Sequence, residues 1–146
     1  MNREIKFRMW DKKSKKMRKV ESIAFGELSP SLEGYPVVNG VGYDFINDKN
    51  IMVHRDLPHF ELMQYTGFKD YNCKEIYEGD IVRFFNDEDY IIKPGYAEVV
   101  FEDGAFCLKH FKYGTECLGN FDIDDMNISV VGNIYENPKL LKESEK

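Results

Sequence analysis

The chain has 146 residues, of which 32% are charged and 14% aromatic, and its formal net charge is −6. A chain of this length forms one domain or a domain with a subdomain, and it can bury roughly two-thirds of the surface that its unfolded form exposes. The sequence contains no run of roughly 20 apolar residues, and the charged start MNREIKF is not typical of a signal peptide. We therefore expect a cytoplasmic protein that does not associate with membranes.

The residue types favour a β-rich fold with free thiols. The three cysteines, Cys73, Cys107 and Cys117, are an odd number without regular spacing, which argues against a disulfide framework. The 11 Phe, 9 Tyr and 1 Trp would each bury about 150 to 250 Å² in a core. We therefore expect aromatic residues, rather than leucine, to dominate the core.

The first predicted element is a β-hairpin within residues 5–23. Ile5, Phe7 and Met9 alternate with more polar residues, which is the period of a half-buried strand. A polar turn over residues 11–16 and a returning strand over residues 17–23 follow. Residues 1–20 carry a net charge of +7, so the other 126 residues carry −13.

This basic hairpin is the candidate partner-contact site of the sequence. Its positive charges could bind nucleic-acid phosphates or the acidic surface of a protein, including a sister subunit, and Trp10 could stack on a base. The simpler interpretation, which we favour, is a solvated turn whose lysines protect an edge strand from unwanted pairing. The candidate contact residues are Arg8, Trp10, Lys12, Lys13, Lys15, Lys16, Arg18 and Lys19.

The next segment predicts a loop and a second hairpin. Residues 27–41 are rich in Gly, Pro and Ser and lack an apolar period, so we expect a loop with one short strand at 35–38. Residues 43–46 and 51–54 then form the two strands of a hairpin, with a turn at residues 47–50.

Residues 62–85 are the central stretch of the chain. Branched and aromatic residues at 62–66 and 81–85 predict two strands, and turn-forming residues lie between them. Gly79 has no Cβ and can adopt the positive φ that turns the chain into Asp80. The sequence YEGDIV at residues 77–82 is typical of the start of a core strand in small SH3-like barrels.

The second half of the chain predicts a hairpin, a closing strand and a helix. Asp103-Gly104 is a strong turn signal between the strands at 98–101 and 105–111. Residues 127–131 would close the barrel, with a bend at Gly132-Asn133. Asn137-Pro138 is typical of a helix start, and we expect a short helix up to residue 143.

No catalytic, metal-binding or cofactor-binding residues are predicted. Cys107 and His110 fall on opposite faces of their strand, so we expect a small core residue and a surface imidazole rather than a metal or nucleophilic pair. The acidic segments 86–89 and 122–125 lack the ligand pattern of a calcium loop. Glu78 and Asp80 are the only carboxylate pair that we considered for a small hydrolase-like enzyme, and alternate residues after a turn usually serve the turn.

Four blocks of sequence resemble the signature blocks of the YopX family of phage and prophage proteins. They are REIKFRMWD at residues 3–11, LMQYTG at 62–67, EIYEGDIV at 75–82 and VGNIYENP at 131–138. The resemblance implies a mainly β, oligomeric protein encoded in bacterial mobile elements, without an established activity or catalytic residues to transfer. Cys73 stands where we would expect a small turn residue such as Gly.

We therefore predict an all-β protein. An N-terminal β-hairpin meander (residues 1–60) precedes an SH3-like β-barrel (61–136) and a C-terminal helix and tail (137–146). The predicted function is that of a non-enzymatic, homo-oligomeric phage or prophage accessory protein with an unknown protein partner and no cofactor. A nucleic-acid-binding module and a small hydrolase-like enzyme are the alternatives.

Overall fold

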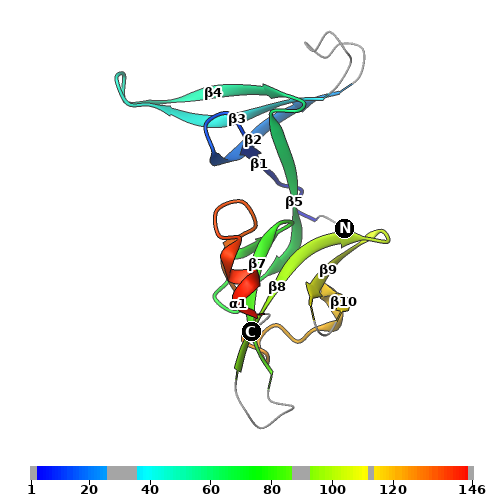
Figure 1. The fold of residues 1–146 in the computed structure, drawn as a ribbon. Coiled ribbons are helices and arrows are strands. Elements are labelled where there is room, and N and C mark those ends of the chain that lie inside the picture. The colour runs from blue at the N-terminus through cyan, green and yellow to red at the C-terminus, as the bar shows by residue number, and fades with distance from the viewer. Residues whose placement is uncertain (1–2, 26–35, 87–92, 112–113, 145–146) are drawn as a thin grey trace. The chain divides into compact units, whose positions relative to one another are not determined.

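The structure is a computed structural model that describes residues 3–25, 36–86, 93–111 and 114–144. The mainly β fold is confirmed: eleven strands in the described residues form two antiparallel sheets, accompanied by one short α-helix (Figure 1). The chain divides into an N-terminal unit, Ile5–Gln64, and a C-terminal unit, Tyr65–Lys146 with Met1–Glu4. The division falls within one long strand, β5, which also contains the predicted boundary between residues 60 and 61.

The N-terminal unit is an antiparallel meander in the strand order β4-β3-β2-β1-β5. The predicted first hairpin is present. In its first strand Met9 and Asp11 are buried and the residues between and before them half-buried, whereas Ile5 precedes the strand and is exposed. The strands are β1 (Phe7–Asp11), β2 (Lys16–Ala24), β3 (Val37–Asp44), β4 (Lys49–Asp56) and β5 (Phe60–Lys69).

The second hairpin is longer than predicted, and its turn lies two residues earlier. Strand β3 includes the described end of the predicted short strand 35–38 and continues through residues 39–41, which were predicted as loop. Residues 27–35 of that predicted segment lie outside the described residues. The Asp44 side chain sets the turn, because it accepts hydrogen bonds from the backbone N–H groups of Ile46 (3.0 Å) and Asn47 (3.2 Å). Such a side chain mimics a backbone turn, so strand β4 begins already at Lys49.

Glycines in β3 allow the N-terminal core to close. A Cβ on Gly40 would lie 2.5 Å from Cε of Met9 and 3.1 Å from the backbone oxygen of Lys19, so any other residue there would displace the end of the buried methionine side chain. Met9 packs with Val38 and Phe60, and the half-buried Val20, Ile23 and Leu62 surround them. The Val-Gly pattern that reads as a loop is therefore a strand facing a close neighbour.

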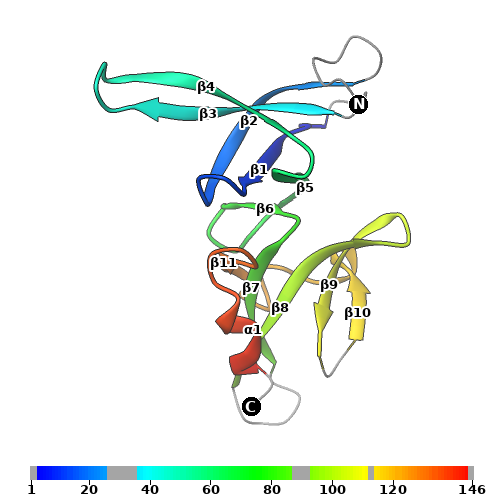
Figure 2. The same ribbon diagram turned by 45° about the horizontal axis from the view of Figure 1, so that its top comes forward.

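The C-terminal unit contains a five-stranded sheet in the order β10-β9-β8-β7-β11 (Figure 2). The predicted hairpin around Asp103-Gly104 joins β8 to β9, and the predicted helix, α1, lies beside β8. The SH3-like barrel stays a prediction. The elements are β6 (Glu75–Tyr77), β7 (Asp80–Asn86), β8 (Lys93–Glu102), β9 (Ala105–His110), β10 (Gly114–Cys117), the 3₁₀ helix η1 (Leu118–Asn120), β11 (Ser129–Asn133) and α1 (Lys139–Ser144).

Aliphatic side chains, not aromatic ones, dominate the core, so that prediction is wrong. Phe84 is the one aromatic residue in the buried cluster of the C-terminal unit as described. Many of the aromatic rings are exposed, among them Phe25, Tyr43, Phe45, Phe68, Tyr71, Phe101 and Phe111. The other buried residues of the cluster are Ile76, Val82, Ala97, Val99, Leu108, Leu118 and Ile128.

A buried aspartate, Asp70, organises the loop of the central stretch. Asp70 accepts hydrogen bonds from Asn72 N–H (2.8 Å) and Lys74 N–H (2.8 Å) with one oxygen, and from Val130 N–H (2.8 Å) with the other. It thereby ties the loop after β5 to strand β11. Cys73 takes a φ of 64°, the conformation for which glycine was expected, and Gly79 has the predicted positive φ, 80°.

In the described residues, the structure contains no helix long and apolar enough to cross a membrane.

Candidate interaction surface of the N-terminal unit

A buried ionic cluster fixes the first hairpin. The carboxylate of Asp11 at the end of β1 accepts hydrogen bonds from Nε of Arg18 (3.0 Å) in β2 and from Nε of Arg55 (2.6 Å) in β4. Ser14 Oγ donates a third (2.5 Å) and the Lys13 backbone N–H a fourth (3.0 Å). Asp11 is fully buried, so these bonds replace its lost hydration.

The cluster keeps Asp11 ionised. Burial alone would raise the pKa of its carboxyl group, but the hydrogen bonds from Arg55, Ser14, Arg18 and Lys13 together lower that pKa well below its ordinary value. Two guanidinium groups face one carboxylate, so the trio of Asp11, Arg18 and Arg55 carries one excess positive charge.

Arg18 is an internal residue rather than a free contact residue. Besides Asp11, its guanidinium donates to the backbone oxygen of Val41 (3.1 Å) and to Ser14 Oγ (2.9 Å). Gly42 makes room for it, since a Cβ there would lie 3.2 Å from Arg18 Nη1 and 2.6 Å from Val53 Cγ2. Arg18 therefore joins strands β1, β2 and β3.

The structure divides the predicted contact residues among three places. The register sets Arg8 opposite Lys19 and Asp11 opposite Lys16. Because side chains alternate along a strand, Arg8, Trp10 and Lys19 lie on one face of the hairpin, and Lys16 and Arg18 lie on the other. The exposed Lys12, Lys13 and Lys15 occupy the turn.

Lys12 also has an acidic partner. Its Nζ lies 3.0 Å from Oε1 of Glu61, and both side chains are exposed, so the pair contributes little to stability. The eight candidate residues therefore do not form one continuous basic surface.

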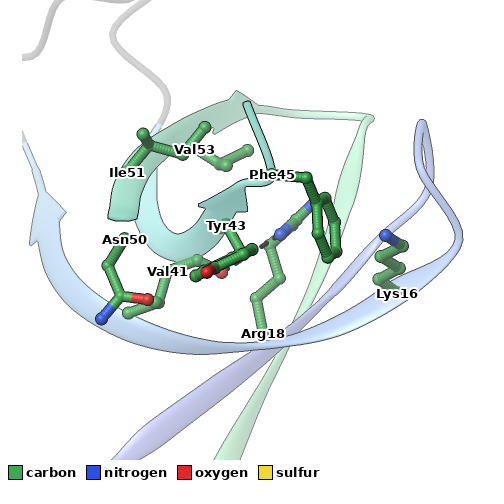
Figure 3. Close-up of a pocket in the computed structure, with 9 residues that line it drawn as sticks. Lys16, Arg18, Val41, Tyr43, Phe45, Asn50, Ile51 and Val53 are labelled. Carbon is green, nitrogen blue, oxygen red and sulfur yellow. Dashed lines mark hydrogen bonds between the residues drawn. The ribbon is translucent and has the colours of Figure 1, made fainter. Parts of the chain in front are cut away.

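A pocket of about 270 Å³ opens on the Arg18 face (Figure 3). The walls of the pocket combine the apolar side chains of Ile51 and Val53 with the ring of Phe45. Gly42 also lines the pocket but has no side chain to fill it. Lys16 and Arg18 come from β2 on the other side. Val41, Tyr43 and Asn50 complete the lining.

Exposed apolar side chains surround the tip of the β3–β4 hairpin. Phe45 is 79% exposed and Ile46 94%, and Tyr43 packs edge-to-face against Phe45 with ring centroids 4.8 Å apart. Ile51 and Met52 at the start of β4 are exposed as well. We call these five residues the apolar tip. None of these five residues was predicted as a contact residue, although Phe45 and Ile46 are adjacent apolar residues directly before the predicted turn at residues 47–50.

The C-terminal unit corrects one sequence expectation and confirms another. His110 is buried rather than on the surface, because it packs edge-to-face against Phe84, with ring centroids 5.5 Å apart. Cys107 is buried as expected. Asp80 is almost fully buried and accepts a hydrogen bond from the backbone N–H of Tyr77 (2.8 Å), as a turn-forming carboxylate would.

Across the residues that the structure describes, no group of three or more His, Cys, Asp or Glu side chains could hold a metal ion.

The comparisons with known proteins point to one family. The crystal structure of protein EF1440 from Enterococcus faecalis superposes with a TM-score of 0.61 at 23% identity, covering 96% of this chain and 99% of that one. The crystal structure of yopX from Bacillus subtilis superposes with a TM-score of 0.59 at 24% identity, covering 93% and 95%. These likenesses show the shared fold. No curated protein matches the chain.

The model of the YopX protein family matches residues 6–142, nearly the whole chain. The four sequence blocks that resemble this family therefore lie within, or overlap, one continuous match. On this evidence the chain belongs to the YopX family.

Proposed function

We propose that this chain is a non-enzymatic interaction protein that acts as a homo-oligomer in the cytoplasm, encoded by a phage or prophage. The observation that carries the proposal is the apolar tip, which places five large apolar side chains in water on one hairpin. Grouped exposed apolar residues mark interaction sites far more often than scattered ones do.

The edge of the sheet supports the same proposal. Strand β4 ends the strand order, and among the described strands it pairs only with β3. Its outer backbone groups are available to pair with a strand of another chain. Charge adds a second reason for self-association, because the first 20 residues carry +7 and the remainder −13.

Sedimentation of the purified chain tests this proposal. We expect the wild type to sediment as a species larger than its 17.2 kDa monomer, and the double variant Phe45→Asp, Ile46→Asp to sediment as a monomer. The matched control is Phe101→Asp, since Phe101 is also exposed (53%) but lies in β8 of the other unit. A monomeric wild type at tens of micromolar, or an unchanged double variant, would contradict the proposal.

Nucleic-acid binding is the second candidate function, because Lys12, Lys13, Lys15 and Lys16 are all exposed around one turn. A fluorescence anisotropy titration with single- and double-stranded nucleic acid tests it at low and physiological salt. If it is right, binding weakens steeply with salt and disappears when these four lysines are changed to Ser. A wild type that does not bind at low salt would exclude it.

A further inference from the structure

Two of the three cysteines lie directly opposite each other in the C-terminal sheet. Cys107 in the middle of β9 pairs in register with Cys117, the last residue of β10. Residues opposite each other on antiparallel strands have Cβ atoms about 4.5 to 5.5 Å apart. Disulfides need Cβ atoms about 3.5 to 4.5 Å apart and Cα atoms about 4.4 to 6.8 Å apart, so a small approach of the strands suffices.

The two thiols differ in their surroundings. Cys117 is exposed, whereas Cys107 is buried and its Sγ donates to the backbone oxygen of Ala105 at 3.6 Å. Burial raises the pKa of the Cys107 thiol, and a hydrogen bond with the Cys117 thiol raises it further. Because Cys117 is exposed and Cys107 is buried, a peroxide in solution reaches Cys117 first.

We propose that Cys107 and Cys117 are a reversible oxidation site, at which a peroxide converts the two thiols into a cross-strand disulfide. The Cys117 thiolate attacks the peroxide; an S–O bond forms, the O–O bond breaks and hydroxide leaves, so that the sulfur becomes a sulfenic acid. The Cys107 sulfur then attacks this sulfur; the S–S bond forms, the S–O bond breaks, and the Cys107 thiol proton leaves with the departing hydroxide as water. Overall, two thiols and hydrogen peroxide yield one disulfide and two waters.

The position of the pair gives the disulfide a structural effect. Strand β10 is an edge strand whose four residues are all exposed, and it continues into η1, where Leu118 is fully buried in the core. A bond from Cys117 to Cys107 would fasten this edge strand to β9 next to that anchor. Reduction by a dithiol would release it.

Oxidation of the purified full-length chain with hydrogen peroxide, followed by mass spectrometry without reduction, tests the proposal. We expect a loss of about 2 Da, set by the two hydrogens that leave as one disulfide forms, and a proteolytic peptide pair joining Cys107 to Cys117. Cys73→Ser should behave as the wild type, whereas Cys117→Ser should form no intramolecular bond. Cys117 is exposed, so its substitution preserves the fold, which circular dichroism verifies.

A second readout is thermal stability. Because the disulfide closes a short loop, the oxidised chain should melt about 5 °C or more above the reduced one, and dithiothreitol should reverse the shift. Two results would overturn the proposal. One is oxidation of Cys117 to a sulfinic acid while Cys107 keeps a free thiol; the other is disulfides that join only different chains or involve Cys73.

Discussion

Asp11 is the residue on which the first hairpin depends. It joins three strands of the N-terminal unit through Arg18 and Arg55, which come from positions 7 and 44 residues further along the chain. Removing one partner from a buried ionic cluster lowers the free energy of unfolding by more than the intact cluster adds to it. The remaining buried charges then have neither hydration nor a counter-charge.

The first prediction is therefore a large loss of stability in Asp11→Asn. The variant leaves two largely buried guanidinium groups without a counter-charge, and we expect the free energy of unfolding to fall by about 3 to 5 kcal/mol. Urea denaturation measures it. The control Asp56→Asn changes an exposed aspartate near the end of β4 and should shift the free energy by less than about 0.5 kcal/mol.

The lowered pKa of Asp11 also predicts an acid-sensitive fold. A carboxyl group whose pKa is lower in the folded state contributes its full stabilisation above its ordinary pKa of 3.8, and this stabilisation is lost as the pH falls further. The midpoint of urea unfolding in the wild type should thus drop between about pH 5 and pH 2. The urea midpoint of Asp11→Asn should drop less over the same pH range. An equal pH dependence of the midpoint in the two proteins would contradict the assignment of this acid sensitivity to Asp11.

Glu98 predicts the opposite dependence. Burial raises the pKa of this β8 carboxyl group, while nearby Lys109 lowers it and Glu102 raises it. Its ionisation therefore costs the folded state stability as the pH rises through the raised pKa. We expect Glu98→Gln to melt at a higher temperature than the wild type at neutral pH. That difference should shrink below about pH 4.5, near the ordinary pKa. The control is Glu21→Gln, because Glu21 is exposed and lies in β2 of the other unit.

At the scale of elements, the hairpin β3–β4 combines a tight sheet with an exposed end. Gly40 and Gly42 let β3 approach β2 and β4, whereas the apolar tip, which begins directly after Gly42, is open to water. The tight part should therefore resist substitution, and the tip should tolerate it without loss of the fold.

Gly42→Ala tests the tight part. The added Cβ would lie 2.6 Å from Val53 Cγ2 and 3.2 Å from Arg18 Nη1, so side chains must move; we expect a loss of about 1 to 3 kcal/mol. The matched control is Gly119→Ala, because its Cβ would meet only Phe68 Cζ at an ordinary 3.7 Å. Chemical denaturation of both variants gives the comparison, and equal stabilities would refute the packing explanation.

Local signals predicted those elements that depend on neighbouring residues. Asp103-Gly104 and the alternation around Met9 each lie within a few positions and gave correct hairpins. Strand β3 was predicted only at its two ends, by the strands at 35–38 and 43–46. The stretch between them was missed because Gly40 and Gly42 make room for side chains from other strands, which no local pattern reveals. The same limit applies to the candidate contact residues. The exposed lysines of the turn could be predicted from neighbouring residues, whereas the internal position of Arg18 depends on a hydrogen bond to Val41, 23 residues away.

At the scale of the whole molecule, strand β5 belongs to both units. Its first half pairs with β1 and its second half with β6. Neither of these two pairings can keep its register if β5 slips, because a shift of one residue turns every side chain of β5 to the opposite face. We therefore expect the two units to unfold together.

Two probes can follow the units separately in urea. Trp10 is the only tryptophan of the chain and lies in β1, so its fluorescence reports on the N-terminal unit. The buried thiol of Cys107 reports on the C-terminal unit through its reaction with a thiol reagent, in a Cys73→Ser, Cys117→Ser background. Coincident midpoints are expected, and two separate transitions would show that the units unfold independently.

The sharing of β5 also governs how the gene could be divided. A cut between Gln64 and Tyr65 would leave residues 60–64 paired with β1 and residues 65–69 paired with β6, but it would break the strand that links the two pairings. Each half-strand would then end in a free terminus, and chain termini are poorly ordered unless they are held in place. Each fragment should therefore be less stable than the same unit in the intact chain, and a split protein that carries the whole of residues 60–69 in both fragments should recover part of that loss.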